Sequence, residues 1–212
     1  CLHTFFFPSL ILNMDRPQKP IEVKVVLLGD QGVGKSSICS RFVSNEFDPN
    51  PEATIGAMFR PKQVYIDDLK KSVKFQIWDT AGQEKFRALA PMYYRDSKIA
   101  VIVYDITKKA SFDCLKSWVE ELKELGPPDI VMVVTANKSD LLEQEVVSES
   151  EARSFANEIG AQFASTSAKK NIGIDKLFVE AYKAMDPNRQ SMRPGGAKLE
   201  DAKPKKKKSC CQ

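Results

Sequence analysis

The chain has 212 residues and carries 32 lysines and arginines against 28 aspartates and glutamates, a net charge of +4. This length suits one domain with a tail, and no uninterrupted apolar run approaches the roughly 20 residues of a membrane-spanning helix. The single histidine, His3, argues against a Ser-His-Asp hydrolase, a Cys-His protease and a multi-histidine metal site.

Residues 1–20 are predicted to form an N-terminal extension. The apolar run at 5–12 lacks the basic residues that precede such a run in a secretory signal peptide. Met14, which is followed by polar residues, is typical of a translation start. We therefore expect residues 1–13 to be an artefact of upstream translation or of the gene model, with a genuine extension as the alternative.

Strand and helix patterns alternate along residues 21–185. Strands are predicted at 23–28, 64–66, 73–78, 99–104, 130–135 and 162–165. Helices are predicted at 36–44, 115–122, 149–159 and 174–185. Pro61 places the first arm of the 64–78 hairpin at a sheet edge, and residues 45–57 predict a long loop. The alternation predicts an α/β domain with a mainly parallel sheet covered on both faces. Ligands then bind at the loops that follow the carboxyl ends of the strands.

The first of these loops, residues 29–36, fits the pattern G-x-x-x-x-G-K-[ST] between a strand and a helix. Its glycines let backbone N–H groups surround phosphates at a helix N-terminus. Lys35 can reach the β- and γ-phosphates, and the Ser36 hydroxyl can ligate Mg²⁺. The predicted nucleotide contacts are Gln31, Gly32, Val33, Gly34, Lys35, Ser36 and Ser37.

A second motif, D-T-A-G-Q at 79–83, follows the hairpin's second strand. Beside a phosphate loop, Asp79 can hold Mg²⁺ through water. Gly82 can offer its N–H to a γ-phosphate, and Gln83 can orient an attacking water. The two motifs together predict hydrolysis of a nucleoside triphosphate.

A third motif, N-K-S-D at 137–140, follows the 130–135 strand. The Asp140 carboxylate can accept from both N1–H and the 2-amino group of guanine. Adenine lacks both donors and would leave a buried charge unpaired. The predicted base contacts are Asn137, Lys138 and Asp140, with Ser167, Ala168 and Lys169 closing over the base through a backbone N–H. A P-loop kinase or ATPase is the alternative, which Asp140 and the lack of an acceptor-substrate domain disfavour.

With these elements in place, residues 21–185 resemble a small GTPase of the Ras superfamily, and within it the Rab family. The Rab likeness is carried by T-I-G-A-x-F at 54–59, by W-D-T-A-G-Q-E-K-F at 78–86 and by Y-Y-R at 93–95. The segments at 89–95 and 103–107 are most similar to the endocytic, early-endosomal branch. The resemblance implies a P-loop NTPase small G domain. Its sheet would have six strands and be mainly parallel, with one antiparallel edge strand and helices on both faces.

The resemblance also implies roles for particular residues. Thr54 would ligate Mg²⁺, sense the γ-phosphate and serve catalysis with Lys35 and Gln83, while Phe47 would pack on the guanine. Residues 45–57 and 80–95 would be two switch loops, ordered by GTP and released after hydrolysis. Effectors would read an aromatic triad of Phe59, Trp78 and Tyr93. Simple packing, in the core for Phe47 and at a sheet edge for the triad, is the alternative.

The implied function is a GTP-binding and GTP-hydrolysing switch that regulates vesicle-mediated, endosomal membrane traffic. Turnover should be slow without an activating protein, because no motif places an arginine to act in cis; Arg87 is the one local candidate. Gln31 stands where many relatives have a smaller residue, so a GTP-locked, poorly hydrolysing scaffold is the alternative. The implied partners are an exchange factor, an activating protein, a GDP-dissociation inhibitor or escort protein, and effectors. We expect a monomer that binds no nucleic acid.

Residues 186–212 are predicted to be a flexible basic tail. They carry eight basic and three acidic residues, whereas residues 1–185 carry 24 and 25. A C-a-a-X box would need cysteine at position 209, which is serine. The terminal C-C-x instead resembles the Rab pattern in which both cysteines, here Cys210 and Cys211, are geranylgeranylated.

Two lipids and the lysines at 205–208 would give an anchor that can still be extracted from an anionic membrane. A nuclear import signal at 204–208 and an inert tail are the alternatives. No cysteine spacing is typical of zinc sites or disulfides, which favours a reducing compartment. We expect the protein on the cytoplasmic face of endosomal membranes, cycling with the cytosol.

Overall fold

The structure is a computed structural model that describes residues 19–185, and of residues 84 and 85 it describes the backbone alone. The tail at 186–212, with Cys210 and Cys211, lies outside the described residues, as does nearly all of the extension at 1–20. The domain boundaries therefore stay predictions. Within residues 19–185, no helix is both long and apolar enough to cross a membrane.

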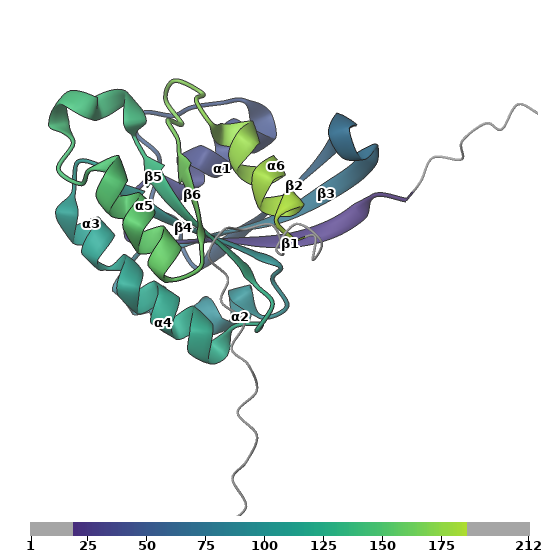
Figure 1. The fold of residues 1–212 in the computed structure, drawn as a ribbon, viewed down its shortest axis with the longest axis horizontal. Coiled ribbons are helices and arrows are strands. Elements are labelled where there is room, and N and C mark those ends of the chain that lie inside the picture. The colour runs from purple at the N-terminus through teal and green to yellow at the C-terminus, as the bar shows by residue number, and fades with distance from the viewer. Residues whose placement is uncertain (1–18, 186–212) are drawn as a thin grey trace, which may run out of the picture.

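A single six-stranded sheet forms the centre of the molecule, with the strand order β2-β3-β1-β4-β5-β6 (Figure 1). Its strands are β1 (Ile21–Leu28), β2 (Ala57–Ile66), β3 (Lys71–Thr80), β4 (Ile99–Asp105), β5 (Val131–Asn137) and β6 (Gln162–Ser165). Strand β2 pairs antiparallel with β3, and every other pair is parallel. The predicted fold class is confirmed, including its single antiparallel edge strand.

Helices cover both faces of the sheet. They are α1 (Lys35–Ser44), α2 (Ala90–Tyr94), α3 (Lys109–Asp113), α4 (Leu115–Leu125), α5 (Glu149–Glu158) and α6 (Ile174–Lys183). Short 3₁₀ segments lie at Asp67–Leu69, Glu84–Leu89 and Ser139–Gln144. Helices α2 and α3 were not predicted, because five residues are too few to show a helical period. The Ser148 hydroxyl accepts from the Glu151 N–H at the start of α5, as the capping pattern predicts.

Strand β2 is much longer than the predicted 64–66 arm. Polar residues such as Arg60, Lys62 and Gln63 interrupt any apolar run in this segment, yet the ladder with β3 extends from Ala57 to Ile66. Pro61 lies within this strand, opposite Gln76. It is tolerated because β2 is an edge strand, as predicted, so the missing N–H costs no ladder bond.

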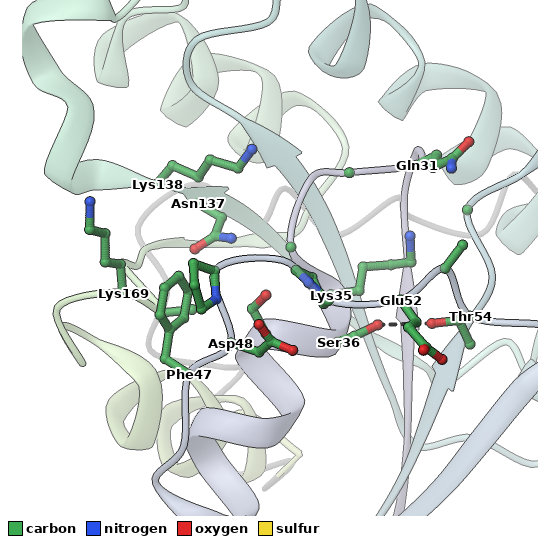
Figure 2. A pocket seen from close by; sticks show the side chains of 18 of the residues that line it. Gln31, Lys35, Ser36, Phe47, Asp48, Glu52, Thr54, Asn137, Lys138 and Lys169 are labelled. Carbon is green, nitrogen blue, oxygen red and sulfur yellow. Dashed lines mark hydrogen bonds between the residues drawn. The ribbon is translucent and has the colours of Figure 1, made fainter.

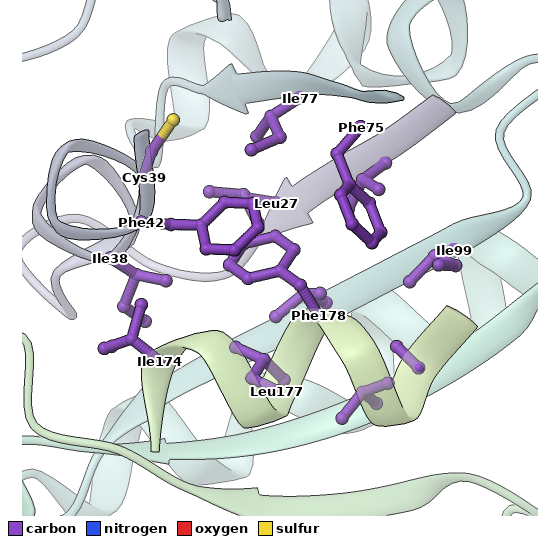
Figure 3. Packing of buried hydrophobic residues seen from close by; sticks show 14 of the residues in the cluster. Leu27, Ile38, Cys39, Phe42, Phe75, Ile77, Ile99, Ile174, Leu177 and Phe178 are labelled. Atoms are coloured by element: carbon purple, nitrogen blue, oxygen red, sulfur yellow. The ribbon is translucent and has the colours of Figure 1, made fainter. Parts of the chain in front are cut away.

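The core has two halves, one on each face of the sheet. Successive side chains of strand β1 point to opposite faces of the sheet, so this strand contributes to both halves. Val25 and Leu27 face α1 and α6, whereas Val26 and Leu28 face α2, α4 and α5. On the first face Phe42 and Phe178 stack with their ring centroids 3.9 Å apart (Figure 3). Such an aromatic pair adds about 0.5–1.5 kcal/mol beyond the burial of its area, and here it joins α1 to α6.

This architecture determines where a site can form. Strands β1, β3, β4, β5 and β6 run in the same direction, so their carboxyl ends meet at one edge of the sheet. The loops that carry all three sequence motifs leave the sheet at that edge. Segments that are more than a hundred residues apart in the chain are thereby brought together.

Candidate functional site

A cavity of about 470 Å³ opens at the carboxyl edge of the sheet. The predicted site residues that line it are Gln31, Gly32, Gly34, Lys35, Ser36, Ser37, Phe47, Thr54, Gly82, Gln83, Asn137, Lys138, Asp140, Ala168 and Lys169. Figure 2 shows Ser36 and Thr54 toward one end of the cavity and Phe47 and Lys169 toward the other. The predicted phosphate and base contacts thus occupy opposite ends of one cavity.

Three predicted contacts, Val33, Asp79 and Ser167, are buried and do not line the cavity. Each instead supports a neighbour that does, as described below. The cavity also has lining residues that were not predicted: Asp48, Pro49, Pro51, Glu52, Ala53, Thr80 and Leu141. Their position in the chain was a usable signal, because each of them lies between two predicted contacts or next to one.

At the phosphate end, the chain turns tightly between β1 and α1. Gly34 has a φ of 99°, which favours glycine, and a Cβ there would lie 2.3 Å from the Asn137 side-chain nitrogen. The Lys35 ammonium crosses the turn and donates to the carbonyls of Gly29 at 2.8 Å and Asp30 at 2.9 Å. The loop is therefore held in a curled form by its own lysine.

Lys35 is 5% exposed. Burial lowers its pKa to about 8, and the negative charges of Asp79 and Asp30 only partly oppose this. A buried ammonium is stabilised by an anion more strongly than a hydrated one is. The burial of Lys35 therefore favours a phosphate group as its partner.

Two hydroxyl groups and one carboxylate form a set of oxygen donors beside this loop. Ser36 Oγ and Thr54 Oγ1 lie 3.0 Å apart, although 18 positions separate them in the chain. Asp79 lies behind them, 3% exposed, and its Oδ1 has no hydrogen-bond partner among the described residues. Burial raises the pKa of Asp79, against a hydrogen bond with Ser36 and the charge of Lys35.

A buried carboxylate oxygen without a partner is destabilising unless a cation neutralises it. Hydroxyl and carboxylate oxygens are the ligands that Mg²⁺ prefers, usually with several waters retained. The donor set of Ser36, Thr54 and Asp79 fits Mg²⁺ on both counts.

The segment after β3 touches the phosphate loop directly. A Cβ at Gly82 would lie 2.5 Å from the carbonyl group of Asp30 and 2.6 Å from the Gln31 nitrogen, so only glycine allows this approach. Gln83 follows, half-buried at the wall of the cavity. Gln83 therefore lies at the cavity wall directly after the Gly82 contact with the phosphate loop.

At the other end, Ser167 orients Asp140. The Ser167 hydroxyl donates to Asp140 Oδ1 at 2.5 Å, which leaves the rest of the carboxylate to face a ligand. The Ser167 N–H is not available for a base, because it donates to the Ile172 carbonyl at 3.0 Å. Ser167 is therefore joined to the cavity through Asp140, which lines it.

Asn137 joins the two ends of the cavity. Its side-chain nitrogen donates to the Val33 carbonyl at 2.8 Å, and its Oδ1 accepts from the Thr166 hydroxyl at 3.1 Å. The residue is 2% exposed, so both bonds are shielded from water. One amide therefore links the phosphate loop with the loops that follow β5 and β6.

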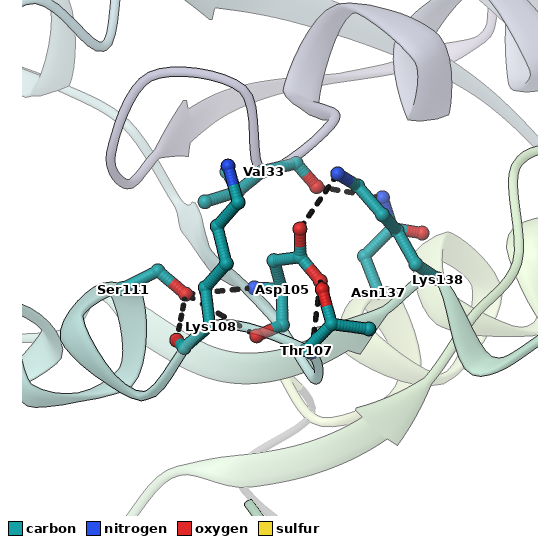
Figure 4. A network of polar contacts seen from close by, with 7 residues as sticks. All are labelled: Val33, Asp105, Thr107, Lys108, Ser111, Asn137 and Lys138. Atoms are coloured by element: carbon teal, nitrogen blue, oxygen red, sulfur yellow. Dashed lines mark hydrogen bonds and ion pairs between the residues drawn. The ribbon is translucent and has the colours of Figure 1, made fainter. Parts of the chain in front are cut away.

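Asp105, at the end of β4, supports Lys138 and was not predicted. Its carboxylate is fully buried and pairs with the Lys138 ammonium at 2.6 Å (Figure 4). Burial raises the pKa of Asp105, but the bond with Lys138 and those from Thr107 outweigh it, so the pKa lies below its ordinary value. A polar residue at the end of a buried strand was the signal that could have identified it.

The predicted effector triad is also brought together, on the surface outside the cavity. The Trp78 ring lies 5.5 Å from that of Phe59 and 5.9 Å from that of Tyr93, between ring centroids. Phe59 is 47% exposed. Three aromatic rings from β2, β3 and α2 thus form one continuous surface.

Comparisons with known proteins agree with this geometry. The chain matches the Ras family over residues 24–186. It is 51% identical to the Ras-related protein Rab-22A of Homo sapiens, over 90% of this chain and 98% of that protein. It is 50% identical to the Ras-related protein Rab-31 of Mus musculus, over 90% and 97% of the two chains. It is 43% identical to the Ras-related protein Rab5 of Nicotiana tabacum, over 92% and 98%.

The lowered pKa of Lys35 predicts that binding of a nucleotide phosphate takes up a proton above pH 8. Before the phosphate binds, Lys35 has a pKa of about 8 and is mostly neutral at pH 8.5; the bound anion then restores its charge. We expect an uptake of about half a proton or more at pH 8.5 and little at pH 6.5. Calorimetric titration with GDP in two buffers of different ionisation enthalpy measures this uptake. Heats at pH 8.5 that do not depend on the buffer would contradict the prediction.

Proposed function

Because this chain belongs to the Ras family and is a small GTPase, we propose that it is a GTP-driven switch of vesicle-mediated membrane traffic at endosomes. The observation that carries the proposal is the single cavity in which Lys35, the Ser36–Thr54 hydroxyl pair and Asp140 meet. This arrangement supports recognition of the phosphates at one end and of the base at the other. The endosomal assignment rests on the similarity of residues 89–95 and 103–107 to the endocytic branch.

Guanine is selected by the carboxylate of Asp140. It accepts from N1–H and the 2-amino group of the base, and the Ser167 hydroxyl on Oδ1 keeps it in place. Adenine would leave the carboxylate without these donors, which disfavours it by about 1–3 kcal/mol for each group left unpaired. Phe47 and Ala168 supply the walls against the base.

Hydrolysis joins a water oxygen to the γ-phosphorus and breaks the bond between that phosphorus and the β,γ-bridging oxygen. GDP leaves with the bridging oxygen, and the proton of the attacking water ends on the inorganic phosphate. Gln83 orients the water, while Lys35 and the Gly82 N–H stabilise charge on the phosphoryl oxygens. Bound Mg²⁺, held at Ser36, Thr54 and Asp79, would neutralise the phosphate charge.

The protein's own groups leave the reaction incomplete, which supports the need for an activating protein. Arg87, the local candidate for a catalytic arginine, donates to Glu121 at 3.1 Å and lies 4.4 Å from the centroid of the Trp118 ring. It is engaged with α4 and is not among the residues that line the cavity. An arginine from a partner contributes about 10³–10⁵ in rate to related enzymes.

Phe59, Trp78 and Tyr93 are proposed to present the GTP-bound state to effectors. The triad draws on β2, which follows the 45–57 loop, and on α2, which belongs to 80–95. Ordering of these loops by the γ-phosphate would therefore change the shape of the aromatic surface. An exchange factor and a GDP-dissociation inhibitor or escort protein would complete the cycle.

A GTP-locked scaffold is the second candidate, and Gln31 is the observation that favours it. Gln31 lines the phosphate end of the cavity and is exposed at its mouth, where an activating protein would insert its arginine. A Gln31→Ala variant that raises stimulated hydrolysis would support this candidate. Efficient stimulated hydrolysis by the native protein would exclude it.

The identity of the bound nucleotide tests the proposal directly. We expect the protein, purified and then denatured, to release close to one molecule of guanine nucleotide per chain, because the cavity has room for one base. Chromatography of the supernatant measures it. Release of ATP, or of no nucleotide, would refute the proposal.

Replacement of Gln83 tests the hydrolytic step. Gln83→Leu should lower the rate of hydrolysis stimulated by an activating protein by about 10²-fold or more, because an attacking water that is not held in position reacts that much more slowly. Single-turnover release of phosphate measures the rate. The matched control is Gln76→Leu, since Gln76 bonds to Glu22 on β1 and does not line the cavity. Equal rates in the two variants would remove Gln83 from the mechanism.

The proposed lipid anchor lies in the part of the chain that the structure does not describe. Replacing Cys210 and Cys211 by serine should move the protein from membranes to the soluble fraction of cells, because two lipid signals are needed for stable anchoring. Its nucleotide content should stay unchanged. Cell fractionation measures the shift, with Cys114→Ser as the control. Continued attachment of the double variant to membranes would contradict lipidation of these cysteines.

A further inference from the structure

One arginine, Arg41 in the last turn of α1, makes contacts with both loops at the base end of the cavity. Its Nε donates to the Ala168 carbonyl at 2.8 Å, and an Nη donates to the Lys169 carbonyl at 3.4 Å. The other Nη donates to the Asn45 carbonyl at 2.6 Å and lies 3.3 Å from Asn45 Oδ1. The guanidinium therefore connects two loops that lie more than a hundred residues apart in the chain.

These two loops carry the walls against which the base is proposed to bind. Ala168 and Lys169 line the cavity on one side, and Phe47, two residues beyond Asn45, lines it on the other. The guanidinium carbon of Arg41 lies 5.9 Å from the centroid of the Phe47 ring, within the range of a cation–π contact. Figure 2 shows Phe47 and Lys169 close to each other at this end of the cavity.

A direct contact reinforces the bridge. Asn171 Nδ2 donates to Asn45 Oδ1 at 3.1 Å, so the same Asn45 side chain is held from both sides. Asn45 itself adopts a left-handed conformation with φ of 58°, and its N–H caps α1 through the Arg41 carbonyl. The direction in which the chain leaves α1 toward Phe47 is thereby determined by contacts that converge on Arg41.

We propose that Arg41 is a positioning residue for the guanine base, and that it sets how slowly the nucleotide dissociates. This inference rests on the proposed function. Release of the base requires the Phe47 wall and the 167–169 loop to separate, and every contact of Arg41 described above opposes that movement. The planar guanidinium has five N–H donors in fixed directions, so it can donate hydrogen bonds to both loops at once. A lysine ammonium could not donate to both loops in fixed directions.

The test is the dissociation rate of GDP that carries a fluorescent group on its ribose. The full chain is loaded with this probe and chased with excess unlabelled GDP at constant Mg²⁺. Arg41→Ala should accelerate dissociation by about tenfold or more, since hydrogen bonds from a charged group are lost. The association rate should change much less, because most interface substitutions act on dissociation.

Arg153 provides a matched control. It also lies over an aromatic ring, with its guanidinium carbon 4.4 Å from the centroid of the Phe163 ring, and it donates to Glu149 on the same helix, α5. It is exposed and does not line the cavity. Arg153→Ala should leave the dissociation rate within about twofold of the native value.

A double-mutant cycle separates positioning from a general loss of stability. If Arg41 acts through the Phe47 wall, the effects of Arg41→Ala and Phe47→Ala on the dissociation rate will not multiply in the double variant. If Arg41 only stabilises the fold, the two effects will multiply, and the inference is wrong. Arg41→Lys keeps the charge and most of the aliphatic side chain. It should still release GDP several times faster than the native protein, because a lysine ammonium can replace only some of the hydrogen bonds that the guanidinium makes.

The outcomes distinguish this inference from the function on which it rests. A native protein that does not bind the labelled GDP would overturn both. A native protein that binds it, with Arg41→Ala or Arg41→Lys releasing it no faster than Arg153→Ala, would overturn the role of Arg41 alone.

Discussion

The cavity depends on one buried amide, that of Asn137. Its nitrogen holds the carbonyl of Val33 and its oxygen holds the hydroxyl of Thr166, so three loops that leave separate strands have to meet around it. The tight turn at Gly34 follows from this, since any side chain there would collide with the amide. Hydrogen bonds shielded from water are directional, and an unpaired member costs about 1–3 kcal/mol. The relative placement of the phosphate and base ends therefore cannot drift.

Around that fixed point, the site concentrates charges that a protein interior ordinarily excludes. Lys35 and Asp79 are buried beside each other, and each is shifted by burial toward its neutral form. A phosphate and a divalent cation would reverse both shifts at once, which is a physical reason for nucleotide and metal to bind together. Asp105 is different, because Lys138 already compensates its charge. It serves to hold a loop, whereas the charges of Lys35 and Asp79 are not compensated in this way.

Sequence patterns predicted most of the fold and most of the cavity lining, and the misses have a common origin. Strand β2 was predicted at a fraction of its length, because an edge strand with one exposed face carries no continuous apolar run. The helices α2 and α3 were too short to show a period. Arg41 belongs to no motif, and the 103–107 segment was read only for its likeness to relatives; the partners of Asp105 and Arg41, Lys138 and the Ala168 carbonyl, lie more than thirty positions away in the chain. Local patterns do not encode such pairs.

The sequence by itself determined the class of chemistry, because a glycine-rich turn with Lys35, an aspartate after a strand and the N-K-S-D segment at 137–140 are local motifs whose spacing the backbone imposes. It also determined the fold class, through the alternation of strand and helix patterns.

Only the tertiary structure decided which side chains face the cavity and which bond to one another. It turned Ser167 away from the base and onto Asp140, paired Lys138 with Asp105, and placed Arg41 between two loops. The physical reason is that hydrogen bonds and ion pairs depend on distances of a few ångströms. In a parallel sheet those distances are set by strand order, which brings residues together regardless of their separation in the chain.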